Sequence, residues 1–183
     1  MGELIGTLRS RGVYDDTMVI ITSDHGQAFN EHGFMYHGTY LYDEIVRIPL
    51  IIKYPHGRRF RKRPGCQSLC NIFPLIRDIL DGKDDRRVTT GSAFAEAYGN
   101  TEHIPKAYSH MMPYIEKTYE KVRKAVYTDS GKMTFNDTDG TIEELYDGKR
   151  EIDPNGSKAK GLAKTLSTEL NRFGKRDGFR VSA

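Results

Sequence analysis

The first 80 residues alternate between helical spacing of apolar side chains and short apolar runs. Apolar residues three and four apart predict helices over 3–11 and 67–80. Apolar runs at 18–22 and 48–53 predict buried strands, because almost every position in them is apolar. A helix is predicted over 39–46, between the two runs. Strand, helix and strand in this order predict a βαβ unit of an α/β domain.

The second half of the chain changes to short segments of strand character. Strands are predicted at 93–97, 124–127, 132–136 and 142–146. The turn pairs Ser130-Gly131 and Asp139-Gly140 separate the later strands, which is typical of hairpins. Helical spacing returns over 157–173. The sequence therefore predicts two parts: an α/β domain over residues 1–88, and a small antiparallel sheet with a C-terminal helix over residues 89–183.

Composition narrows the classes of partner. The chain has 183 residues, 37% of them hydrophobic, which is enough for one substantial core. A net charge of +3 gives no reason to expect nucleic acid. The dense basic run at 58–63 is interpreted as a solvated loop, with a patch for phosphate or an anionic surface as the alternative. Cys66 and Cys70 lack further Cys or a nearby His, so they are interpreted as small, partly buried thiols, with a zinc site as the weaker alternative.

The sequence says little about the compartment. No run of residues is long enough to cross a membrane, and no signal peptide precedes the first predicted helix. If the chain is complete as printed, a cytoplasmic location is expected; otherwise the compartment stays open.

The strand at 18–22 ends in Asp24-His25-Gly26, the most informative stretch of the chain. Adjacent residues of an extended strand point to opposite faces, so Asp24 and His25 can contact one ion only where the chain turns. Gly26 permits such a turn. Oxygen and nitrogen donors suit a divalent cation, and they leave Ca²⁺, Mn²⁺, Zn²⁺ and Mg²⁺ open. The alternative is that Asp24 caps a turn and His25 is a structural polar residue.

Several motifs resemble, in order and spacing, the C-terminal portion of the sulfatase family of the alkaline-phosphatase superfamily. They are Ser23-Asp24-His25-Gly26, Glu31-His32-Gly33, His37-Gly38, Leu41-Tyr42-Asp43-Glu44, Val46-Arg47-Ile48-Pro49-Leu50, Lys124-Ala125-Val126-Tyr127 and Glu144-Leu145-Tyr146-Asp147. The resemblance extends from about residue 10 to 170. It implies an α/β fold: part of an alkaline-phosphatase-like mixed sheet flanked by helices, followed by a small antiparallel sheet and a C-terminal helix.

The resemblance also implies roles for the site residues. Asp24 and His25 are expected to hold one divalent cation, with Ca²⁺ preferred and Mn²⁺ or Zn²⁺ as alternatives. His37 stands where the family places a Lys or His that contacts the sulfate and assists the leaving oxygen, which a protonated imidazole can do; a loop histidine bonded to a carbonyl is the alternative. His32 is expected either to orient a ligand from the second shell or simply to hold the loop together.

The family's nucleophile motif is not in this sequence. Sulfatases convert a Cys or Ser, in a Cys/Ser-x-Pro-Ser-Arg setting, to formylglycine, and a paired-aspartate motif completes their metal site. Cys66 precedes Gln-Ser-Leu and Cys70 precedes Asn-Ile-Phe, so neither fits. Formylglycine is therefore expected only in a missing N-terminal half, and this chain alone is expected to be inactive, because two ligands hold a divalent ion weakly.

The function predicted from the resemblance is a metal-dependent sulfuric ester hydrolase. Its expected substrate is a small sulfate or phosphate ester or a sulfated sugar. A phosphodiester or phosphonate monoester hydrolase is an alternative, because sulfate and phosphate esters share a tetrahedral oxyanion. A non-catalytic remnant, or a subunit that pairs with a separate N-terminal chain or with its own copy, is another. An unrelated metal-binding domain is the least favoured. Apolar strands with open edges would leave the isolated chain poorly soluble or oligomeric.

Overall fold

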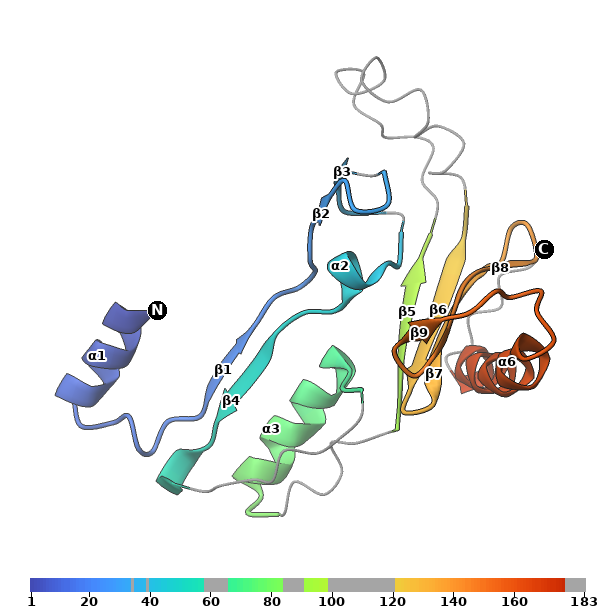
Figure 1. Ribbon diagram of the computed structural model, residues 1–183. Helices are drawn as coiled ribbons and strands as arrows, with labels where there is room; N and C mark the ends of the chain where they lie inside the picture. Colours follow the sequence, from blue (N-terminus) through green and yellow to red (C-terminus); the bar gives the residue numbers. More distant parts are fainter. Residues whose placement is uncertain (34, 39, 58–65, 84–90, 99–120, 177–183) are drawn as a thin grey trace. The chain divides into compact units, whose positions relative to one another are not determined.

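The computed structural model describes residues 1–33, 35–38, 40–57, 66–83, 91–98 and 121–176 (Figure 1). The chain forms two compact units. Unit 1 comprises Met1–His37 and Tyr42–Lys62, and unit 2 comprises Gly38–Leu41 and Arg63–Ala183. The predicted boundary at residue 88 falls in a stretch outside the described residues and stays a prediction.

Unit 1 is built from short elements. In chain order they are α1 (Gly2–Ser10), β1 (Val19–Thr22), β2 (Ala28–Phe29), β3 (Met35–Tyr36), α2 (Asp43–Val46), β4 (Leu50–Lys53) and the 3₁₀ turn η1 (Pro55–Gly57). Strand β1 pairs antiparallel with β4, with Val19 opposite Lys53, and β2 pairs antiparallel with β3. The predicted βαβ unit is therefore wrong in one respect, because strands joined through a βαβ crossover run parallel.

The helix predicted over 39–46 is shorter than expected. Helix α2 begins only at Asp43, and Tyr42 in front of it has extended backbone angles. Tyr40 and Leu41 are buried and belong to unit 2, where the Tyr127 hydroxyl donates to the Leu41 carbonyl at 3.1 Å. These two residues contributed to the apolar pattern that predicted a helix, but they are buried within unit 2 and are not part of α2.

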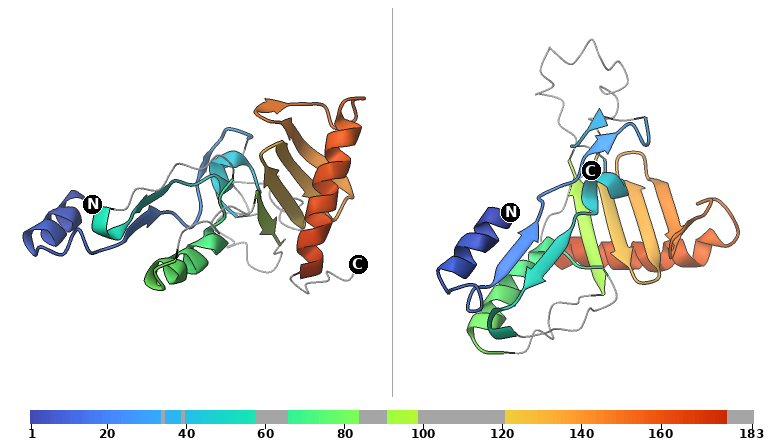
Figure 2. Two further views of the ribbon diagram at one scale, coloured as in Figure 1. Left: turned by 90° about the horizontal axis from the view of Figure 1, so that it is seen from below. Right: turned by 60° about the vertical axis from the view of Figure 1, so that its left-hand side comes forward.

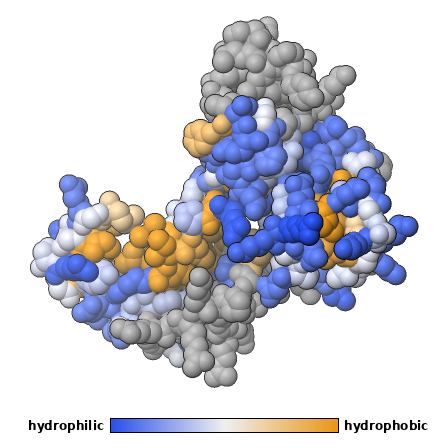
Figure 3. All heavy atoms as spheres, in the orientation of Figure 1, coloured by the Kyte–Doolittle hydropathy of each residue, from blue (hydrophilic) through white to orange (hydrophobic). Residues whose placement is uncertain are grey.

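The β1–β4 ribbon keeps its apolar side chains at least partly exposed. No residue of either strand is buried, and Ile51 is 58% exposed. Figure 3 shows hydrophobic atoms gathered over these two strands. One end of the ribbon is fixed by Lys53, whose ammonium group donates to the carbonyls of Tyr14, Asp15 and Thr17. Hydrogen bonds therefore hold this ribbon more than burial does.

Unit 2 begins with a helical segment. The 3₁₀ turn η2 (Leu69–Asn71) leads into α3 (Ile72–Leu80), which lies within the predicted range 67–80. Pro74 falls in the first turn of α3, where a missing N–H costs no helical hydrogen bond. Among the described residues, no helix has the length and apolar character needed to cross a membrane.

The larger part of unit 2 is a sheet covered by one helix. Its strands are β5 (Ser92–Ala97), β6 (Arg123–Thr128), β7 (Gly131–Asn136), β8 (Thr141–Asp147) and β9 (Arg150–Glu151), and its helix is α6 (Ala159–Arg176). The strands lie in this order, and all neighbours run antiparallel. Both views of Figure 2 place α6 along one face of the sheet. The predicted small antiparallel sheet with a C-terminal helix is confirmed.

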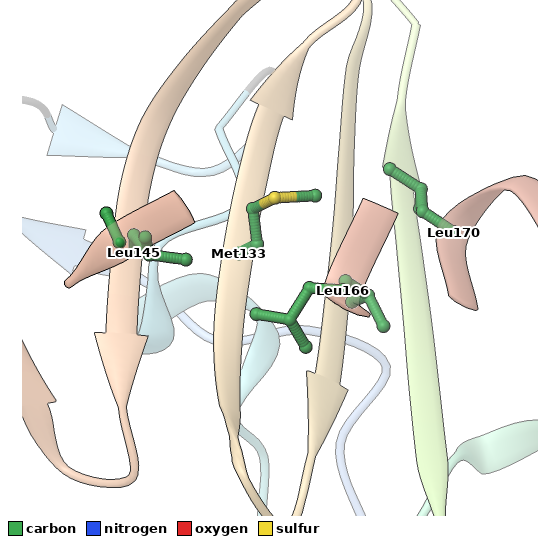
Figure 4. Packing of buried hydrophobic residues seen from close by; sticks show 6 residues of the cluster. Met133, Leu145, Leu166 and Leu170 are labelled. Carbon is green, nitrogen blue, oxygen red and sulfur yellow. The ribbon is translucent and has the colours of Figure 1, made fainter. Parts of the chain in front are cut away.

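The core of unit 2 lies between this sheet and α6. Six residues at 8% exposure or less form it: Val126, Met133, Leu145, Ala159, Leu166 and Leu170. Figure 4 shows Met133 and Leu145 of the sheet with Leu166 and Leu170 of the helix. The other face of the sheet carries buried polar residues, among them Arg123, Lys132, Thr134, Asn136 and Glu144. This alternation is what a period-two strand requires.

Candidate functional site

The chain turns sharply after β1, as the Asp24-His25-Gly26 motif predicts. The Asp24 carboxylate accepts the backbone N–H of His25 at 3.0 Å, and the Ser23 hydroxyl donates to the His25 carbonyl at 2.6 Å. The turn brings Oδ2 of Asp24 to 3.7 Å from Nε2 of His25. The two adjacent side chains therefore lie on one side of the chain and not on opposite faces.

Gly26 holds this turn against helix α2. Its N–H donates to the carbonyl of Ile45 at 2.6 Å, and the next N–H, of Gln27, donates to the carbonyl of Glu44 at 2.9 Å. A Cβ atom at Gly26 would overlap the Glu44 carbonyl oxygen. Glycine is therefore required here by the close approach of two backbones, and not by a left-handed conformation.

The His25 ring is oriented by its own backbone. Nδ1 lies 2.6 Å from the Gly26 carbonyl oxygen, which can only accept, so the proton sits on Nδ1. Nε2 then carries the lone pair, the form in which an imidazole binds a metal ion. The side chain of His25 is 41% exposed and that of Asp24 is 86% exposed, so both donors are open to solvent.

The backbone N–H of His25 holds the pKa of the Asp24 carboxyl below its usual range, and the nearby imidazole adds to this effect. Asp24 is therefore ionised at neutral pH, as a ligand for a cation must be.

His37 lies on the His25 ring. The two imidazole centroids are 3.8 Å apart with 26° between the planes, and Nδ1 of His37 is 3.0 Å from the side-chain oxygen of Gln27. The structure thus brings Asp24, His25 and His37 together, although His37 comes thirteen positions after Asp24 in the sequence. Sequence reasoning did not single out Gln27, because a lone glutamine in a loop carries no pattern.

His32 lies against the start of α2. Its Nδ1 is 2.7 Å from a carboxylate oxygen of Glu44, and its ring stacks on Tyr42 with 4.0 Å between centroids. These contacts tie the loop to the start of α2. Both roles expected of His32, holding the loop and orienting a metal ligand, stay predictions.

The described part of unit 1 brings together two candidate metal donors, Asp24 and His25, and no third one. Among the residues that the structure describes, no three His, Cys, Asp or Glu side chains converge on a point where they could hold an ion. Cys66 is half-buried, as expected, whereas Cys70 is exposed. Asp24 and His25, with His37 beside them, therefore form part of a site.

Comparison with known proteins identifies the family of the chain. The sulfatase family model matches residues 1–82. The chain is 49% identical over 149 residues to "Uncharacterized sulfatase YidJ" of Escherichia coli, covering 77% of this chain and 27% of that protein. The chain belongs to the sulfatase family. A second relative, N-acetylglucosamine-6-O-sulfatase of Bacteroides thetaiotaomicron, is 27% identical over 159 residues, covering 82% of this chain and 28% of that protein.

Solved structures of other proteins share the fold. A putative sulfatase from Bacteroides thetaiotaomicron superimposes with a TM-score of 0.69 at 17% identity, covering all of this chain and 42% of that one. A phosphonate monoester hydrolase from Silicibacter pomeroyi gives a TM-score of 0.67 at 20% identity, over 96% of this chain and 38% of that one. The predicted α/β, alkaline-phosphatase-like fold is confirmed. This sulfatase-family chain spans about a quarter of the length of the two curated relatives above.

Proposed function

We propose that this chain is the metal-binding part of a metal-dependent sulfuric ester hydrolase. The observation that carries the proposal is the cluster at the end of β1, where Asp24 and His25 converge and His37 stacks on His25. Membership of the sulfatase family supports it. In this proposal Asp24 and His25 hold the ion and His37 contacts the ester.

The donor pair fits a divalent cation. The 3.7 Å between the Asp24 oxygen and the His25 nitrogen is a span that one ion can bridge with bonds of about 2.0–2.5 Å. One carboxylate oxygen and one imidazole nitrogen suit Ca²⁺, Mn²⁺ or Zn²⁺, with Ca²⁺ preferred from the family resemblance. When bound, the cation would polarise the sulfate oxygens and activate the nucleophile.

The imidazole of His37 is suited to assist the departure of the leaving group. It is exposed, and its Nδ1–H is taken by Gln27, so Nε2 is the nitrogen available to the ester. A protonated Nε2 can neutralise charge on a sulfate oxygen, or give its proton to the oxygen that leaves. Because the ring lies on that of His25, an ester held beside the ion is within reach of His37.

The nucleophile, expected to be formylglycine, and the remaining ligands are proposed to come from residues outside this sequence. The 183 residues alone would bind a divalent ion weakly and hydrolyse no ester, because two ligands do not fix its coordination. A sulfated sugar is the proposed substrate class, since one relative is an N-acetylglucosamine-6-O-sulfatase.

A phosphonate monoester or phosphodiester hydrolase is the second candidate. The likeness in fold to the Silicibacter pomeroyi phosphonate monoester hydrolase favours it. Sulfate and phosphonate esters both present tetrahedral oxyanions, so the same three side chains serve either reaction. The two candidates differ in their substrates, and the test below includes both ester classes.

The test compares Asp24→Ala with Asp43→Ala in the enzyme completed by its nucleophile-bearing part. Loss of a metal ligand exceeds the roughly 10–100-fold effect of an outer-shell change, so Asp24→Ala should lower kcat/KM for 4-nitrophenyl sulfate by at least about 100-fold. Asp43→Ala removes a carboxylate that is 48% exposed and lies 3.7 Å from the Arg47 guanidinium, and it should leave activity nearly unchanged.

Both variants should keep the far-ultraviolet circular dichroism of the wild type. Retained Mn²⁺-dependent activity in Asp24→Ala would remove Asp24 from the metal site. Faster hydrolysis of a 4-nitrophenyl phosphonate monoester than of the sulfate ester would move the reaction to the second candidate. No hydrolysis of either ester by the completed wild type would leave a non-catalytic subunit.

A further inference from the structure

His37 comes directly after the short β2–β3 ribbon, and a glutamine lies opposite it. At this end of the ribbon Ala28 pairs with Tyr36, so the same register, continued by one residue, places Gln27 opposite His37. Residues that lie opposite each other in an antiparallel pair have their side chains on the same face. Gln27 and His37 are therefore cross-strand neighbours within unit 1, although ten positions separate them in the sequence.

The two side chains are in hydrogen-bond contact. Oε1 of Gln27 lies 3.0 Å from Nδ1 of His37. An amide oxygen can only accept, so Nδ1 carries the proton and the lone pair of the neutral ring is on Nε2. The Gly26 carbonyl has the same effect on His25. Both of the stacked imidazoles thus have their lone pair on Nε2, and for His37 a single side chain sets this form.

The backbone of Gln27 is held independently of its side chain. Its N–H donates to the Glu44 carbonyl of α2 at 2.9 Å, and the next residue, Ala28, is 1% exposed. A substitution at Gln27 therefore removes the hydrogen bond to His37 while the backbone bond to α2 remains. This separation makes the contribution of the side chain measurable by itself.

We infer that Gln27 is a positioning residue for His37. The inference rests on the proposed function, in which His37 contacts the ester. By accepting the Nδ1 proton, Gln27 limits rotation of the ring and leaves Nε2 as the nitrogen that exchanges a proton with the ester. Without this acceptor, the neutral ring could carry its proton on either nitrogen. An orientation fixed before substrate binds favours a productive geometry.

The experiment detects the ring proton of His37 directly. In the 183-residue chain with isotope-labelled histidine, magic-angle-spinning NMR at about pH 9, where imidazoles are neutral, distinguishes the two tautomers and does not require a monomer. The signals of His37 are those missing from His37→Asn. The wild type should carry the proton on Nδ1. Gln27→Met keeps the side-chain length but has only a weak sulfur acceptor, so its ratio of Nδ1–H to Nε2–H should fall by about two- to tenfold.

Three comparisons make the result specific to this hydrogen bond. Gln27→Glu keeps an acceptor oxygen at the same position and should keep the Nδ1–H form of His37. Glu31→Leu removes a different hydrogen bond of the same hairpin, from the Phe29 N–H at 2.5 Å, and should leave the tautomer of His37 unchanged. His25 should keep its Nδ1–H form in every variant, because its acceptor is a backbone carbonyl.

Four outcomes overturn the inference. The first is a wild type in which His37 carries its proton on Nε2, and the second is an unchanged tautomer ratio in Gln27→Met. The third is a Gln27→Glu variant that loses the Nδ1–H form as Gln27→Met does. The fourth is an equal fall of the ratio in Glu31→Leu, which would assign the effect to the order of the hairpin and not to Gln27.

Kinetics separate this inference from the proposed function. In the completed enzyme, Gln27→Met should lower kcat for 4-nitrophenyl sulfate by about two- to tenfold, with a smaller change in KM, because His37 acts mainly on the leaving group. A rise in KM with unchanged kcat would overturn positioning for the chemical step. If the completed wild type hydrolyses no ester, the proposed function fails, and the tautomer measurement still decides whether Gln27 orients His37.

Discussion

The two units bury very different amounts of apolar side chain. Unit 2 has a continuous core of six residues at 8% exposure or less, whereas β1 and β4 of unit 1 have no buried residue. Yet Asp24, His25 and His37 all lie in unit 1. The well-packed core and the candidate site residues therefore lie in separate units of this chain. Hydrogen bonds, more than buried apolar side chains, hold the unit that carries the candidate site.

The largest expected effect comes from the core of unit 2. Leu166 is 0% exposed, so Leu166→Ala should lower the free energy of unfolding by about 2–5 kcal/mol, as burial of a leucine in a packed core predicts. Urea unfolding followed by circular dichroism measures it. Leu80→Ala is the control, because Leu80 is 81% exposed and its loss should change stability by at most about 0.5 kcal/mol. Equal losses of unfolding free energy in Leu166→Ala and Leu80→Ala would show that the core of unit 2 does not carry its stability.

The next effect is local to unit 1. Gly26→Ala places a methyl group on the Glu44 carbonyl, so it should destabilise unit 1 by about 1–3 kcal/mol, the range for overpacking. Hydrogen exchange at residues 24–46 measures it while unit 2 serves as internal reference. Gly161→Ala is the control: Gly161 lies in α6 with open space around it, so alanine should stabilise the helix by about 0.5–1 kcal/mol. Unchanged exchange in Gly26→Ala would contradict the proposed close contact.

The exposed ribbon predicts association of the isolated chain. Ile51→Lys puts a charge on the apolar surface of β4 and should therefore oppose association through this surface. The fraction of monomer in sedimentation velocity should rise roughly several-fold over wild type. Leu80→Lys controls for the general effect of an added charge. A wild-type chain that is monomeric and melts cooperatively would remove the basis of this prediction.

The smallest effect concerns the charge of Asp24. Its pKa is lowered in the folded chain, so the ionised form contributes stability above the unfolded-state pKa, and this contribution is lost as pH falls through the folded-state pKa. Asp24→Asn should therefore melt slightly below wild type at neutral pH, and the two melting temperatures should converge in acid. Thermal melts across the acidic range measure this. If the difference in melting temperature widened in acid, the pKa of Asp24 would be raised by folding and not lowered.

The sheet of unit 2 was predictable because local patterns specify it. Turn pairs such as Ser130-Gly131 fix where strands end, and antiparallel neighbours need only short connections. The direction of β1 relative to β4 was not predictable, because an apolar run indicates burial and not pairing. The short α2 was missed for a similar reason: Tyr40 and Leu41 are buried by contacts with residues more than eighty positions away.

Only the part of the candidate site formed by residues adjacent in sequence was predictable. Adjacency and the following glycine placed Asp24 and His25 together, and the turn confirms that geometry. The stacking of His37 on His25 depends on how a loop folds back, which no spacing reveals.

The assignment of Gly38–Leu41 to unit 2 has a consequence for how this chain could be recombined with a relative. A single crossover between residues 62 and 66 would exchange the β5–β9 sheet and α6 while leaving Gly38–Leu41 behind. Tyr40 and Leu41 would then meet a foreign strand in place of Arg123 and Tyr127. A functional chimera therefore requires two inherited pieces that are far apart in the gene, and natural exchange of the C-terminal sheet between family members should carry co-varying changes at Tyr40, Leu41, Arg123 and Tyr127.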